Sequence, residues 1–154
     1  MQNQELFREL SDTEDALKRA ITALIQASER YCATFPASVK EGLPSYADAK
    51  SNVSAAYYMY ATALSYVLQS ANGTLSALSP LVEKADKAML PEVSHRCTEL
   101  IQAFDHYSEE ALSPYFEESQ RLIHGAGDTI ALSPLYQATR QLVRQSEDFL
   151  SKLS

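Results

Sequence analysis

The apolar residues of this chain recur in steps of three and four, and this period restricts what the chain can fold into. Between residues 6 and 31 the steps join Leu10, Leu17 and Leu24 along one side of a helix. Strands would need alternation with period two, and no stretch of the sequence shows it. The 4 glycines in 154 residues also argue against a turn-rich sandwich or barrel. The sequence therefore predicts an all-α fold.

Proline signals divide the helical pattern into segments. The first helix should end at Phe35-Pro36, because the residue before a proline avoids the α conformation. Residues 36–45 are predicted to form a loop, and a second helix should begin near Tyr46. The tripeptide Leu-Ser-Pro begins at residues 78, 112 and 132, and serine before proline is typical of a helix start. Further helices are therefore expected to begin at Ser79, Ser113 and Ser133.

Two places leave the path of the chain open. Asn72-Gly73 fits either a helix cap or a point that a longer helix passes through, so the sequence does not decide whether residues 72–79 break a helix. An apolar stripe through Met89 and Val93 continues across Pro91, which either kinks one long helix or opens its second half. The whole chain, residues 1–154, is predicted to form a single domain. Its expected architecture is an antiparallel bundle of four main helices, long and partly kinked at proline.

The 32 residues 51–82 contain no charged side chain, although charged residues make up 21% of the chain. A membrane span needs about 20 predominantly apolar residues, and serines, threonines and tyrosines interrupt this segment, so a span is not favoured. Two interpretations are open. The helix is either central in one bundle and covered on most sides, or it packs its own bundle with one face and a second subunit with the opposite face. The predicted self-association face consists of Ser54, Tyr58, Ala61, Ser65 and Leu68.

A second unusual segment, residues 99–118, holds six acids and neither lysine nor arginine. A solvated helix face explains this composition, and a docking patch for a basic partner is the alternative. Because the net charge is −7, nucleic acid and anionic membranes are not favoured as partners. The predicted interaction surface consists of Glu99, Asp105, Glu109, Glu110, Glu117 and Glu118.

Motifs for catalysis and metal binding are sparse. The sequence has no nucleophile elbow, phosphate loop or dinucleotide-binding motif. Residues 92–95, Glu-Val-Ser-His, match one half of the paired Glu-x-x-His motif of di-metal bundles. The second half is missing, because Ala103 and Arg121 stand three residues before the other two histidines. We therefore predict no catalytic residue, no metal site and no cofactor.

The predicted function is that of a non-enzymatic helical interaction or assembly protein, an adaptor that acts through protein–protein contacts and forms a homodimer if the uncharged helix is a subunit contact. The two cysteines, Cys32 and Cys97, fit small core residues. The first five residues lack a signal-peptide pattern, so an intracellular, cytoplasmic protein is expected. The alternative is a bundle enzyme or ligand-binding bundle, with a pocket formed by Glu92, His95, Tyr57, Tyr60 and Tyr66.

Two family resemblances add further alternatives. Residues 43–50, Leu-Pro-Ser-Tyr-Ala-Asp-Ala-Lys, followed by Ala56-Tyr57, resemble the nuclear exosome cofactors that assist RNA processing, in which an Ala-Lys precedes a helix with an apolar-Ala-Tyr core. This resemblance covers residues 5–73 and implies a role in RNA processing, although the His-Pro start of the family's next helix and its basic C-terminal tail are missing. The long, proline-kinked helices also resemble a small BAR-type dimer, which implies membrane association. Such domains use longer helices and a basic concave face.

Overall fold

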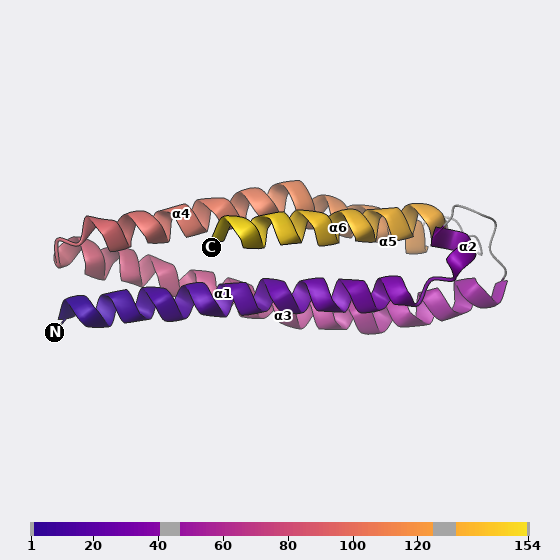
Figure 1. Ribbon diagram of the computed structural model, residues 1–154, viewed down its shortest axis with the longest axis horizontal. Coiled ribbons are helices and arrows are strands. Elements are labelled where there is room, and N and C mark those ends of the chain that lie inside the picture. The colour runs from indigo at the N-terminus through magenta and orange to yellow at the C-terminus, as the bar shows by residue number, and fades with distance from the viewer. Residues whose placement is uncertain (1, 41–46, 125–131, 154) are drawn as a thin grey trace.

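The computed structural model describes residues 2–40, 47–124 and 132–153, and it is 95% helical with no strand in these ranges. Four helical rods run alternately up and down and pack side by side (Figure 1). The predicted all-α antiparallel bundle is thus confirmed. The elements are α1 (Gln2–Ala33), α2 (Ala37–Lys40), α3 (Ala47–Lys87), α4 (Pro91–Tyr107), the π-helical turn η1 (Ser108–Leu112), α5 (Ser113–His124) and α6 (Leu132–Leu153).

The core follows the apolar period along every rod. On α1, Leu17, Ile21 and Leu24 are buried, as the steps of three and four predict. On α3 the buried positions include Val53 and Leu64, which face α1 and the rod formed by α4, η1 and α5. No helix in the described ranges combines the length and the apolar character that a membrane crossing requires.

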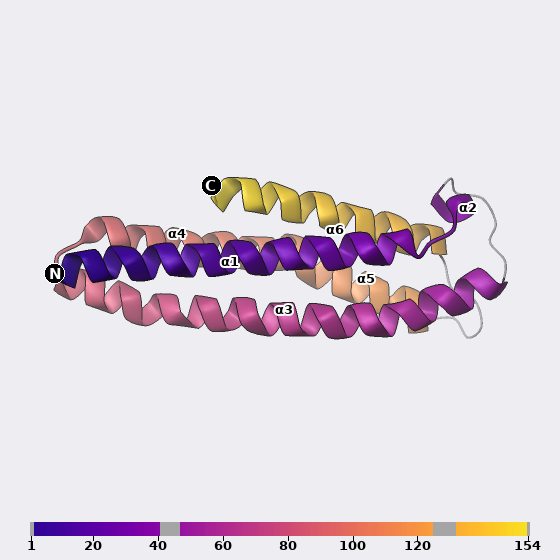
Figure 2. The ribbon, with the colours of Figure 1, turned by 60° about the horizontal axis from the view of Figure 1, so that its bottom comes forward.

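The interpretation of residues 51–82 as a central helix is wrong. Helix α3 lies along an outer edge of the bundle (Figure 2), and only one of its sides is buried. On the opposite side Tyr58 is 61%, Met59 78% and Tyr66 70% exposed. The absence of charge in this segment is therefore not explained by burial within the chain.

The predicted helix start at Ser79 is also wrong, because α3 continues through Asn72-Gly73 and Pro80 to Lys87. The chain reverses two residues later, at Met89, whose φ is 59°. There the N–H of Leu90 donates to the carbonyl of Ala85 at 2.8 Å, and the N–H of Met89 donates to the carbonyl of Asp86 at 3.1 Å. This pair of bonds is a Schellman cap, which satisfies carbonyls at the end of α3. Met89 is consequently 85% exposed and does not belong to the core stripe.

The proline residues act differently at each site. Pro91 occupies the first turn of α4, so it opens a helix and does not kink one. Helix α5 begins at Ser113, as predicted, but it follows α4 and η1 without a break, so the three form one continuous rod. A proline inside a helix removes a hydrogen bond and crowds the carbonyl four residues earlier. The π-helical turn directly before Pro114 widens the helix at this point.

Two other predicted helix boundaries agree with the structure, and one predicted loop differs from it. Helix α1 ends at Ala33, just before Phe35-Pro36, and α6 includes Ser133-Pro134 in its first turn, as predicted. The predicted loop 36–45 instead contains the short helix α2, whose Val39 is buried. Residues 41–46 lie outside the described residues, and with them the first half of the segment that resembles the exosome cofactors.

Candidate interaction surfaces

The residues of the alternative enzyme pocket do not come together. Tyr57 and Tyr60 are buried, whereas Tyr66 is 70% exposed. The hydroxyl of Tyr57 contacts Ser119, which lies 24 residues beyond His95 on the α4–α5 rod, a separation of roughly 36 Å along the helix. In the described ranges no three His, Cys, Asp or Glu side chains are close enough to hold a metal ion.

Four buried tyrosines instead form pairs with small hydroxyl residues on neighbouring helices. The hydroxyl of Tyr60 bonds that of Ser28 at 2.7 Å, and the hydroxyl of Tyr115 bonds that of Thr139 at 2.9 Å. Tyr57 and Tyr107 make the same kind of contact with Ser119 and Ser146. All four of these Ser and Thr side chains are fully buried. The pairs tie the four rods together, so we assign them to the architecture of the bundle.

Burial also determines the chemistry of these side chains. Loss of solvation raises the pKa of the Tyr60 and Tyr115 phenols. It likewise raises the pKa of the Cys32 and Cys97 thiols, both of which are buried. These groups therefore stay protonated at neutral pH, in agreement with the prediction that both cysteines are core residues.

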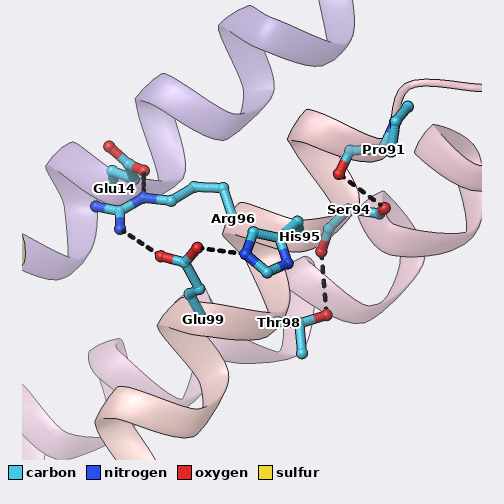
Figure 3. Close-up of polar contacts among 7 residues, drawn as sticks. All are labelled: Glu14, Pro91, Ser94, His95, Arg96, Thr98 and Glu99. Carbon is cyan, nitrogen blue, oxygen red and sulfur yellow. Dashed lines mark hydrogen bonds and ion pairs between the residues drawn. The ribbon is translucent and has the colours of Figure 1, made fainter.

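Arg96 joins three helices at the point where α6 ends, and Figure 3 shows its contacts with Glu14 and Glu99. Its Nε donates to Glu14 of α1 at 2.5 Å, its Nη1 to Glu99 of α4 at 3.3 Å, and its Nη2 to the carbonyl of Leu153 at 3.1 Å. His95 also contacts Glu99, at 2.8 Å. A cation at a helix C-terminus is stabilised by the exposed carbonyls and the helix dipole. The hydrogen bond to Glu14 raises the pKa of Arg96. Glu99 thus has a structural role in addition to its place on the surface.

The six acids of the predicted interaction surface do not share one face. Glu99 and Glu110 line a groove of about 540 Å³ between α4 and α6, and Glu110 also lines an adjoining hollow of about 180 Å³ with Glu118. Asp105 lies in a different hollow, between α3 and α4. The remaining two acids, Glu109 and Glu117, are exposed and line none of these hollows. The helical turn of 100° per residue divides the patch.

The groove between α4 and α6 has an apolar floor. It includes the pair Tyr107 and Phe149, whose rings stack with centroids 4.4 Å apart, and the small side chains of Ala103 and Ala111 leave space beside them. The C-terminal half of α6 inclines away from α4 (Figure 2). The two adjoining hollows make one groove, which we call the α4/α6 groove.

Carboxylates stand on both rims of the α4/α6 groove. Glu99 and Glu110 come from the α4 side and Asp148 from α6. The basic side chains along the groove are Lys152 and His106. The sequence did not predict Asp148 as part of this surface. It lies 30 residues after the acidic segment and lines the groove only because α6 packs beside α4. The predicted antiparallel packing of the helices is the signal that could have indicated Asp148 at this surface.

The outward side of α3 is the second candidate surface. Of the predicted self-association face, Tyr58 and Ser65 are exposed, while Ser54, Ala61 and Leu68 are half-buried. A line in which every position is exposed lies one residue further along the helix. We call this line the α3 outer stripe, which consists of Ala55, Met59, Thr62, Tyr66, Gln69 and Gly73.

Comparison of the chain with protein-family models, with curated proteins and with solved structures gives no match. The resemblances to exosome cofactors and to BAR-type dimers therefore stay predictions. The function is inferred below from the surfaces of the bundle.

Proposed function

We propose that this protein is a non-enzymatic interaction module that binds a basic, amphipathic helix of a partner protein in the α4/α6 groove. One observation supports the proposal, an apolar floor with carboxylates on both rims. Amphipathic helices bind such grooves with their apolar side, and charged rims select partners of the opposite sign. Between residues 99 and 118 the groove runs for about 28 Å, enough for five turns of a bound helix.

The rim carboxylates differ in how far other side chains already neutralise them. Glu99 is bound by Arg96, and Glu118 is bound by Arg121 at 2.7 Å. The Arg121 hydrogen bond lowers the pKa of Glu118. Glu110 contacts His106 at 3.4 Å but is 65% exposed, and Asp148, on the α6 rim, is also exposed. We therefore expect Glu110 and Asp148 to provide most of the attraction for a cationic partner.

A defined peptide pair tests this proposal. One helical peptide carries a leucine and alanine stripe flanked by lysines, and its counterpart has glutamate in place of each lysine. Titration of isotope-labelled protein should shift the amide resonances of Ala103, Ala111 and Phe149 with the basic peptide and not with the acidic one. The double variant Glu110→Gln/Asp148→Asn should weaken binding by roughly 2- to 30-fold, since an exposed ion pair contributes about 0.2–1 kcal/mol.

The chain offers a matched control for this variant. Glu109 and Glu147 each lie next to a rim acid in sequence, are exposed, and do not line the groove. The double variant Glu109→Gln/Glu147→Gln changes the net charge by the same amount and should bind the basic peptide as the wild type does. Equal weakening by both double variants would indicate general charge attraction, and absence of binding by either peptide would reject the proposal.

A further inference from the structure

The charge distribution of the chain singles out one face for contact with a second copy. The net charge is −7, so two copies repel each other over most orientations. Residues 51–82 carry no charge over a helix length of about 48 Å. Five large hydrophobic side chains are exposed in the described residues, and three of them, Tyr58, Met59 and Tyr66, lie in this segment. Exposed apolar patches of this kind mark interaction sites.

Gly73 is a second, independent observation on the same face. It is exposed in the interior of a 41-residue helix, where glycine is less favourable than alanine. A Cβ added at Gly73 would meet nothing within 4 Å, so packing inside this chain gives no reason for a glycine here. A close approach by a neighbouring molecule is one condition that favours a residue without a side chain.

The spacing of the α3 outer stripe is symmetric about Tyr66. Met59 lies seven residues before Tyr66, and Gly73 lies seven residues after it. Seven residues make about two helical turns, so all three positions face the same direction. We propose that the protein forms a homodimer in which two α3 helices pack antiparallel about a two-fold axis at Tyr66. Each Met59 then packs over Gly73 of the partner subunit, and the two Tyr66 rings meet at the axis.

A hollow beside the α3 outer stripe would enlarge the proposed contact. Next to Met59, α1 and α3 enclose an apolar hollow of about 320 Å³ whose lining includes Ala27, Ala56 and Ala63. Isologous contacts of two-fold dimers require a patch that is complementary to itself, and a large residue opposite a glycine meets this condition twice. The proposal does not depend on the α4/α6 groove, which lies between other helices.

Sedimentation equilibrium from about 1 μM to 1 mM measures the dimer. Met59→Glu and Tyr66→Glu should each raise the dissociation constant at least tenfold, because each puts a charge without an opposite partner into the contact. Thr98→Glu adds the same charge at an exposed position of α4 and should leave the constant unchanged. Circular dichroism checks that each variant keeps its helical fold. A wild type that stays monomeric throughout this range, or a dimer indifferent to Met59→Glu and Tyr66→Glu, overturns the proposal.

A charge swap tests the register. Met59→Lys and Gly73→Glu should each weaken the dimer, and the double variant Met59→Lys/Gly73→Glu should regain at least part of the affinity, because opposite charges then meet at both ends of the contact. The single variant Gly73→Gln separates folding from association. It should raise the unfolding temperature of the dilute monomer and weaken the dimer several-fold. Failure of the double variant to regain affinity, or a dimer unaffected by Gly73→Gln, would overturn the antiparallel arrangement.

Discussion

Two tyrosines with stacked rings differ in the state of their hydroxyl groups. The ring centroids of Tyr31 and Tyr60 lie 4.5 Å apart, and the Tyr60 hydroxyl bonds Ser28, whereas the buried Tyr31 hydroxyl has no hydrogen-bond partner among the described residues. Tyr60→Phe should lower the free energy of unfolding by about 1–3 kcal/mol, because it leaves the Ser28 hydroxyl buried and unpaired. Tyr31→Phe should be neutral or stabilising by up to about 1 kcal/mol, because it removes an unsatisfied polar group. Urea unfolding compares the two variants. An equal loss of unfolding free energy at both positions would contradict the difference between the two hydroxyl groups.

At the residue scale, the sequence predicts which positions are buried better than it predicts what they contact. The apolar period correctly places Leu17, Leu24 and Leu64 in the core. It says nothing about the pairing of Tyr60 with Ser28, since the two lie 32 residues apart and meet only when α1 packs on α3. The same limit applies to the groove, because Glu109 and Glu110 have the same sequence context and only packing separates them.

At the scale of the helix, one tripeptide has three outcomes. Leu-Ser-Pro lies in the interior of α3 at residues 78–80, joins the end of the π-helical turn η1 to the start of α5 at residues 112–114, and begins α6 at residues 132–134. Because the tripeptide is the same at each site, the local sequence alone could not predict which of these three structures it would adopt. At the first site Leu78 and Leu81 are both buried against neighbouring helices, and this packing holds the helix together despite Pro80.

This comparison predicts opposite effects of two proline substitutions. Pro80 is exposed in a helix interior, where proline costs about 3 kcal/mol relative to alanine, so Pro80→Ala should raise the free energy of unfolding by roughly 1–3 kcal/mol. Pro91 is exposed in the first turn of α4, where its missing N–H needs no partner. Pro91→Ala should therefore be neutral or slightly destabilising, since it makes the unfolded chain more flexible. Thermal and urea unfolding provide the measurement, and a loss of stability in Pro80→Ala would contradict the account of α3.

For the whole molecule, the buried tyrosines predict a sharp loss of stability at alkaline pH. They come from α1, α3 and the α4–α5 rod, and burial raises the pKa of Tyr31, Tyr60, Tyr107 and Tyr115. For Tyr107 the folded-state pKa is about 12, against about 10 in the unfolded chain. Above pH 10 the unfolded chain releases these protons and the folded chain keeps them. Stability that is fully present below pH 10 is therefore lost as the pH rises.

Each such tyrosine contributes a slope of about 1.4 kcal/mol per pH unit in the interval between its two pKa values. Urea unfolding at each pH unit from 8 to 12 should show a nearly constant free energy of unfolding up to pH 9 and a steep fall above pH 10. Lysines also titrate in this range, so the slope of the wild type alone does not identify the tyrosines. Tyr107→Phe resolves this, because it removes one titrating phenol and leaves every lysine in place. Its slope between pH 10 and 12 should be smaller than that of the wild type by the contribution of one tyrosine, and an unchanged slope would show that Tyr107 ionises as readily in the bundle as in the unfolded chain.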